Sequence, residues 1–372
     1  MSYQTNNIPS LTIGKHTAKI PIIQGGMGVG ISMSGLASAV AEAGGIGVLS
    51  TVAIGILSGS KKFKQSNENT IIDQIQKAKK ATKGVVGCNI MVAISDYDNL
   101  IACAVKAQVD ILFLGAGLPL RFPEGYTPDK LKDTNTAVVP IVSSAKAAKL
   151  IFKFWEKKYN VLPDGVIVEG PMAGGHLGFK DDEIESPFKT LENIIPGVVS
   201  TVRQFETKHN ISIPVIAAGG VFTGGDIDKF FKLGAKGVQL GTRFVATHEC
   251  DADIRFKEAF VKAKKEDITI IKSPVGLPGR AINNKFLEQV SAGERKPFKC
   301  PWKCLKTCDY KTAPYCIAAA LSNAKKGNLE NGFVFAGSNA YRVNKIISVK
   351  ELINSLTQEY ENTSGLLEKK AQ

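Results

Sequence analysis

A histidine stands among four glycines in the segment EGPMAGGHLGF, residues 169–179, and the whole chain has only four histidines. An imidazole exchanges protons near neutral pH. Glycines let the backbone approach a bound molecule closely because they carry no Cβ. The segment follows a strand-like run. We therefore expect either a tight turn with one polar residue or a catalytic group, His176, beside a cofactor that contacts Gly174 and Gly175.

Two more glycine-rich turns follow strand-like runs, AAGGVFTGGDIDKFFKLG at 217–234 and QLGTRF at 239–244. Backbone N–H groups in such turns, together with the amino end of a helix, can bind a phosphate dianion. The alternative is a pair of ordinary strand-to-helix turns. Because two glycine-rich turns are more than turning requires, we expect a phosphate site made by Gly219, Gly220, Gly241 and Thr242.

A further glycine turn, QGGMGVGIS at 24–32, lacks the G-x-G-x-x-G spacing of dinucleotide sites. The position that would need the third glycine is Ile31 or Met33. A Rossmann site is therefore not indicated. The glycines here either serve the turn alone or let a flat ring lie against the backbone.

Four of the seven cysteines crowd into seventeen residues, at Cys300, Cys304, Cys308 and Cys316. The odd total argues against a disulfide framework. Four thiolates can ligate zinc or an iron–sulfur cluster, although the usual C-x2-C pair is missing. If the segment is helical, Cys304 and Cys308 share one face. We expect a metal site here, with buried free thiols and redox-active thiols as the alternatives.

Eight short apolar or β-branched runs recur along the chain, and each ends in glycine or small polar residues. Such runs are typical of strands that are buried on both faces, as in a parallel sheet inside a shell of helices. They lie at residues 20–26, 45–50, 84–92, 109–117, 137–144, 165–171, 213–220 and 237–244.

Most of the intervals carry helical patterns, such as SAKAAKLIFKFWEKKYN at 144–160, with apolar residues three to four apart. Eight strand and helix units predict an α/β fold, a (β/α)8 TIM barrel, with a doubly wound open sheet as the alternative. In such barrels the active site lies at the carboxyl ends of the strands, and phosphate is bound after strands seven and eight. The glycine turns would converge there.

The regular alternation of strand and helix patterns ends after the eighth strand. Residues 248–329 hold helical, basic and cysteine-rich pieces, and SVKELINSLTQEY at 348–360 looks like the closing helix. We therefore expect a lid domain at 248–329, inserted after the eighth strand, and a barrel formed by 1–247 and 330–372.

The composition limits the partners. The net charge is +13, but only seven of the 47 basic residues are arginine, and the lysines are scattered. No nucleic-acid-binding motif is visible, so we expect a solvated lysine surface, with attraction to an anionic substrate or an acidic carrier protein as the alternative. No apolar run reaches the roughly 18 residues of a membrane span. The polar start MSYQTNNIPS lacks a secretory signal. We expect a cytoplasmic protein that binds neither nucleic acid nor membranes.

Five motifs together resemble those of the nitronate monooxygenases, formerly called 2-nitropropane dioxygenases, and of the related flavin-dependent enoyl-acyl-carrier-protein reductases. In chain order they are PIIQGGMG, NIMV, EGPMAGGHLG, PVIAAGGV and GVQLGTRF, and they span residues 21–244. The resemblance implies a barrel that binds FMN non-covalently, which agrees with the phosphate turns.

The resemblance also implies roles for single residues. The flavin ring would lie along Gly25, Gly26 and Met27, and Asn89 would hydrogen-bond to it. His176 would lie on the substrate side of the ring, as a base or as a polarising group. The phosphate end would be held by Gly219, Gly220, Gln239, Gly241 and Thr242.

The first functional hypothesis is the oxidation of alkyl nitronates with O2, through electron transfer to FMN and attack of oxygen on the substrate radical. His176 could also deprotonate a neutral nitroalkane if its pKa lies near neutrality. The alternatives are an NAD(P)H-dependent enoyl-thioester reductase, served by an acyl carrier protein, and a quinone reductase. Outside catalysis, the alternative is a flavin or metal sensor. Each of these enzymes would take a small-molecule substrate. The sequence is compatible with a homo-oligomer.

Overall fold

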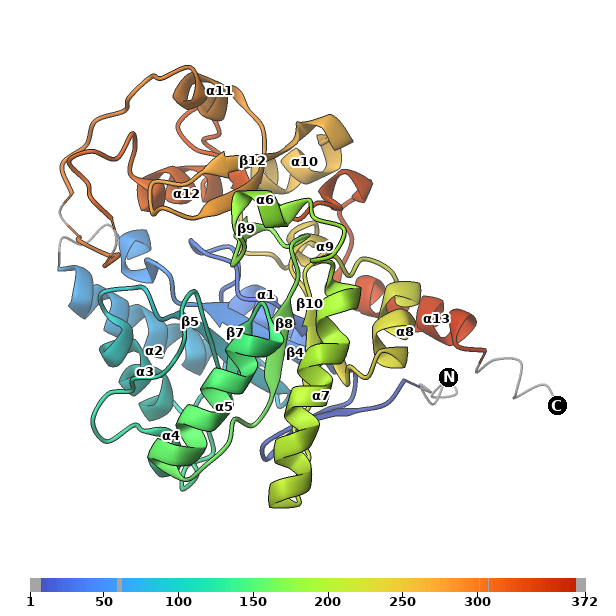
Figure 1. Cartoon of the computed structure of the whole chain (residues 1–372). Coiled ribbons are helices and arrows are strands. Elements are labelled where there is room, and N and C mark those ends of the chain that lie inside the picture. Colours follow the sequence, from blue (N-terminus) through green and yellow to red (C-terminus); the bar gives the residue numbers. More distant parts are fainter. Residues whose placement is uncertain (1–7, 59–61, 301, 307, 366–372) are drawn as a thin grey trace.

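The centre of the molecule is a closed barrel of eight parallel strands (Figure 1). The computed structural model describes residues 8–58, 62–300, 302–306 and 308–365. The barrel confirms the predicted (β/α)8 fold and excludes the open doubly wound sheet. Its strands are β3 (Ile22–Gln24), β4 (Ile46–Ser50), β5 (Val85–Met91), β6 (Ile111–Gly115), β7 (Ala137–Val142), β8 (Val166–Glu169), β10 (Val215–Ala218) and β11 (Gly237–Leu240).

Apart from polar residues at or near their carboxyl ends, the strands are apolar on both faces, because alternate side chains point into the barrel and out toward the helices. In β8, Val166 and Val168 pack in the cluster beneath the helices. Ile167, between them, packs inside the barrel against Ile216 of β10. The next inward position along β8 is Glu169, at the carboxyl end of the strand.

A ring of helices surrounds the barrel (Figure 1). Helix α13 (Val349–Thr363) packs against both α1 (Ser34–Glu42) and α8 (Gly224–Lys232), and so closes the ring. Its amino end is capped by Ser348 and Glu351, each of which bonds to the backbone of the other. No helix in the described ranges combines the length and apolarity of a membrane span. The helices are α1 (Ser34–Glu42), α2 (Phe63–Ala81), α3 (Tyr97–Lys106), α4 (Pro128–Leu131), α5 (Ala145–Tyr159), α7 (Leu191–His209), α8 (Gly224–Lys232), α9 (Thr242–Val245) and α13 (Val349–Thr363).

A short hairpin, β1 (Leu11–Ile13) and β2 (His16–Ala18), closes the amino end of the barrel. Leu11, Ile13 and Ala18 belong to the same buried cluster as the side chains inside the barrel. The hairpin therefore acts as an apolar plug, and it leaves the carboxyl end of the barrel as the open one.

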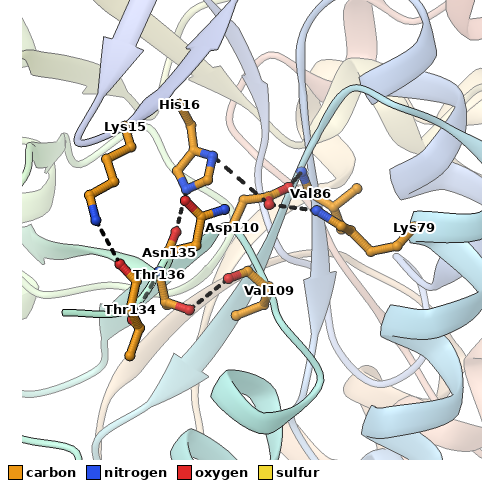
Figure 2. Close-up of polar contacts among 9 residues, drawn as sticks. All are labelled: Lys15, His16, Lys79, Val86, Val109, Asp110, Thr134, Asn135 and Thr136. Atoms are coloured by element: carbon orange, nitrogen blue, oxygen red, sulfur yellow. Dashed lines mark hydrogen bonds and ion pairs between the residues drawn. The ribbon is translucent and has the colours of Figure 1, made fainter. Parts of the chain in front are cut away.

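A buried carboxylate ties this hairpin to the barrel (Figure 2). Asp110, just before β6, accepts the amide of Val86 at 2.8 Å and the ammonium group of Lys79 at 2.5 Å. His16 of the hairpin lies 3.9 Å from the same carboxylate, and its other ring nitrogen bonds to the carbonyl of Asn135. This network satisfies the polar groups that the plug buries.

A second sheet lies over the carboxyl end of the barrel, in the order β12 (Ile268–Lys272), β13 (Pro278–Ile282), β14 (Val334–Phe335), with β9 (Gly175–His176) also paired to β13. Around it are α6 (Asp181–Ile184), α10 (Ile254–Lys262), α11 (Lys285–Ser291) and α12 (Ile317–Lys325), at the top of Figure 1. The sheet crosses the boundary of the predicted lid, because β9 and β14 lie outside 248–329. The division into a barrel and a lid therefore stays a prediction.

Candidate active site

A cavity of about 500 Å³ opens between the carboxyl end of the barrel and the second sheet. The turns after the barrel strands form its lower wall, and α12, β14 and the loop before α12 contribute its upper wall. Every cofactor and catalytic residue expected from the sequence lines this one cavity. They are Gly25, Gly26, Met27, Asn89, Gly174, Gly175, His176, Gly219, Gly220, Gln239, Gly241 and Thr242.

The first glycine turn is narrow because two polar side chains pack against it. A Cβ on Gly26 would lie 2.4 Å from the Cβ of Asn89, and one on Gly25 would lie 3.2 Å from the side chain of Gln239. No residue other than glycine fits at position 26 without a shift of the turn or of β5. Asn89 and Gln239 thus pack against the turn, and both residues line the cavity.

The turn after β10 is a cradle of backbone amides. Gly219 and Gly220 have φ values of +82° and +114°, which favour glycine, and a Cβ on Gly219 would lie 2.7 Å from the carbonyl oxygen of Gly170. Within the described residues, the amides of Gly219, Gly220 and Gly241 donate to no other group of the chain. Amides of this kind can bind an anion.

The amino end of α8 does not add to this cradle as expected. Thr223 caps the helix, and the carboxylate of Asp226 accepts the amides of Phe222 and Thr223. These donors already have an anionic partner, so the glycine turns are the remaining place for a phosphate. Asn339 steadies the cradle by donating its side-chain amide to the carbonyl of Gly220 at 2.9 Å.

His176 reaches the cavity on β9, which pairs with β13 so that His176 lies opposite Gly279. Its Nε2 lies 2.7 Å from the hydroxyl of Ser273, and its ring meets the ring of Phe335 edge-on at 5.1 Å. Burial lowers the pKa of His176 to about 4. The imidazole is therefore neutral at physiological pH, with one ring nitrogen engaged by Ser273.

The turn that carries His176 is held from above by an arginine that sequence reasoning missed. Arg280 of β13 is buried, and its Nη1 donates to the carbonyl oxygens of Pro171 and Ala173. Neither Arg280 nor Ser273 belongs to a recurring motif. Their only sequence signal is their position within 248–329, the segment expected to cover the site.

Glu169, the first residue of the segment 169–179 that contains His176, was also assigned no role from the sequence. The alternation of side chains along β8 points Glu169 into the barrel mouth, where it lines the cavity. This alternation of side chains along the predicted strand is the sequence signal that could have identified Glu169 as a cavity residue. No histidine, cysteine or cation accompanies Glu169 on β8 or on the two neighbouring strands, β7 and β10.

The predicted metal site is not supported. Within the described residues, no three His, Cys, Asp or Glu side chains converge as a metal would require. The expected helix through Cys304 and Cys308 is absent in the described part of 300–316, and Cys316 is the N-cap of α12. Cys304 instead lines the cavity, and its carbonyl accepts the amide of Ser95 at 3.1 Å. Burial raises the pKa of the Cys304 thiol to about 12 and keeps it protonated.

Comparisons with known proteins agree with the fold and the motifs. The model of a family described as nitronate monooxygenase matches residues 9–359. A probable nitronate monooxygenase of Staphylococcus aureus is 26% identical over an alignment of 310 residues, which covers 74% of this chain and 78% of that protein.

Two solved structures are similar over nearly the whole chain. The structure of FabK from Thermotoga maritima has a TM-score of 0.72 at 29% identity and covers 96% of both chains. A nitroalkane oxidase from Streptomyces ansochromogenes has the same fold, with a TM-score of 0.70 at 21% identity, and covers 94% of this chain and 98% of its own.

Proposed function

The chain belongs to the nitronate monooxygenase family, and on that premise we propose that it is an FMN-dependent oxidoreductase that oxidises alkyl nitronates with O2. The observation that carries the proposal is the joining, in one cavity, of an amide cradle after β10 to a neutral imidazole on β9. The amide cradle suits the phosphate of a mononucleotide. The neutral imidazole suits an anionic substrate beside the cofactor.

The residues present fit FMN. The free amides of Gly219, Gly220 and Gly241 would hold its phosphate. Glycine at position 26 lets the first turn lie directly against Asn89, and both line the cavity in which the flat ring would lie. Asn89 would hydrogen-bond to that ring. When bound, FMN would supply the acceptor for the electrons that leave the substrate.

His176 is suited to bind a nitronate that is already formed. Deprotonation of a neutral nitroalkane by His176 would require a pKa near neutrality. A base with a pKa of about 4 has little driving force for this step, so we do not assign it to His176. Ser273 accepts the amide of Val275 at 3.4 Å and can donate its own proton to Nε2. Nδ1 of His176 would then carry the ring proton and donate it in a hydrogen bond to a nitronate oxygen.

Anaerobic rapid mixing tests this function. Protein reconstituted with FMN is mixed with an alkyl nitronate in the absence of O2, and the flavin absorbance is followed. We expect the nitronate to bleach the flavin and the parent nitroalkane to do so far more slowly. Bleaching by neither compound would contradict nitronate oxidation.

The second candidate is an NAD(P)H-dependent reductase of enoyl thioesters, served by an acyl carrier protein. It is favoured by apolar residues in the lining of the same cavity, against which an acyl chain could pack; they include Ile94, Leu305, Ile317, Ala318 and Leu321. The net charge of +13 suits an acidic carrier protein. The same rapid-mixing experiment separates the candidates. Bleaching by NAD(P)H, followed by return of the absorbance with an enoyl thioester, indicates the reductase, and its return with a quinone indicates a quinone reductase.

A further inference from the structure

The carboxyl group of Glu169, at the floor of the cavity, has no role in the proposed reaction. Glu169 is the last residue of β8, between β7 and β10, and lies opposite Ala218 in the strand register. The inward position before it, Ile167, is fully buried inside the barrel. Glu169 is therefore the uppermost inward side chain of its strand. It is partly exposed, and it lines the cavity.

This carboxyl group has no polar partner within the described residues, whether a hydrogen bond or an ion pair. The other titratable groups along the described wall are His176 and Cys304, and no lysine or arginine lines it. The flanking strands β7 and β10 carry no charged residue. Arg280, on β13 above, is committed to the carbonyls of Pro171 and Ala173.

We infer that Glu169 binds the cofactor as a neutral carboxylic acid, donating a hydrogen bond to it from the floor of the cavity. The inference rests on the proposed FMN function. The cradle at Gly219 and Gly220 directly follows Ala218, the register partner of Glu169. An ionised carboxylate there would face a bound dianion with no cation to compensate it. The protonated acid avoids this repulsion and gains a donor.

The charge state before binding agrees with this role. Burial raises the pKa of Glu169 from its usual 4.5 to about 7. At pH 8 the free protein therefore holds Glu169 mostly ionised, roughly nine parts in ten. If the bound state requires the acid, each FMN that binds takes up close to one proton at this pH. The affinity for FMN then falls about tenfold for each pH unit above 7.

Titration calorimetry on the FMN-free protein measures this uptake directly. FMN is added at pH 8 in two buffers of different ionisation enthalpy, and the difference in heat gives the number of protons taken up. The phosphate of FMN is already a dianion at this pH, since its second pKa is about 6, and contributes no proton. We expect close to one proton for the wild-type protein.

Two variants separate the role of Glu169 from a general charge effect. Glu169→Gln keeps the shape and an N–H donor, so it should bind FMN without proton uptake and at least as tightly as the wild type at pH 8. Glu124→Gln removes an exposed carboxylate outside the cavity and should behave as the wild type. Equal proton uptake by the wild type and Glu169→Gln would overturn the inference, while FMN binding itself would leave the proposed function intact.

A second measurement applies if Glu169→Gln does not fold. A difference infrared spectrum of the wild-type protein with and without FMN at pH 8 should gain the carbonyl band of a protonated carboxyl group. Absence of that band would overturn the inference. Failure of the wild-type protein to bind FMN at all would instead contradict the proposed function.

Discussion

Nε2 of His176 lies 2.7 Å from the hydroxyl oxygen of Ser273, although 97 residues separate the two in the chain. The pairing of β9 with β13 brings them together, since it places His176 opposite Gly279. The histidine comes from a glycine motif, whereas the serine comes from a segment without one. The orientation of the candidate catalytic group therefore depends on the part of the chain that covers the barrel.

Ser273→Ala should retain FMN and lower turnover by about tenfold, which corresponds to the net value of one hydrogen bond, ~1.4 kcal/mol. The imidazole would lose the partner that sets its tautomer and its orientation. Steady-state kinetics with a nitronate and an FMN titration measure the two effects. Ser273→Thr keeps the hydroxyl and should restore most of the rate. Equal losses in the Thr and Ala variants would show that packing, and not the hydroxyl, matters at this position.

His176→Asn should bind FMN like the wild type and lose most turnover. The imidazole lines the cavity, and a positioned proton-transfer or hydrogen-bonding group contributes about 10²–10⁴-fold to a rate. Flavin absorbance confirms loading, and turnover is then measured on loaded protein. Near-normal turnover would reduce His176 to a structural residue of the turn.

The ring of His176 should remain neutral down to about pH 5, because burial holds its pKa near 4. In the unfolded chain the pKa returns to about 6.5, so between these values the unfolded state binds the proton and the folded state does not. Acidification from pH 6.5 to 4 therefore destabilises the fold through this residue. NMR titration of the ring protons, assigned with His176→Asn, measures the pKa. A midpoint above 6 would contradict the burial argument.

Gly26→Ala should weaken FMN binding by at least about tenfold, because the added Cβ would lie 2.4 Å from the Cβ of Asn89. Overpacking of this kind also costs about 1–3 kcal/mol of stability. Fluorescence titration with FMN and urea unfolding measure the two effects. Gly197→Ala in α7 is the matched control, since its Cβ would meet Ala145 at an ordinary 3.5 Å. The control should keep its FMN affinity and gain up to about 1 kcal/mol in helix stability.

Asp110→Ala should destabilise the fold by about 2–3 kcal/mol without changing FMN affinity in the folded protein. The substitution leaves the amide of Val86 and the ammonium group of Lys79 without their acceptor at the closed end of the barrel. Lys79 is partly exposed, which keeps the expected cost below that of a fully buried pair. Urea unfolding measures the change. A parallel loss of FMN affinity would mean that the two ends of the barrel are coupled.

The barrel and the glycine turns of the candidate cofactor site could be predicted from the sequence because both depend on local patterns, whereas the roles expected of Met27, Asn89 and Gln239 came from the family resemblance. A strand buried on both faces must be largely apolar, so the eight strands stand out as apolar runs with few polar residues. The carboxyl ends of parallel strands meet at one end of a barrel. Turns as far apart as Gly25 and Gly241 were therefore expected to line one cavity, and they do.

Other features depend on contacts that no local pattern records. Ser273 and Arg280 meet the His176 turn only through the register of β13 with β9. The spacing of Cys304 and Cys308 suggested ligands on one helix face, but the described backbone between them forms no helix, and Cys304 became part of the cavity wall. Sequence alone therefore determined which turns meet at the barrel mouth. Tertiary structure decided what covers them, because side chains that come from distant segments are placed by strand pairing and packing, and not by their neighbours in the chain.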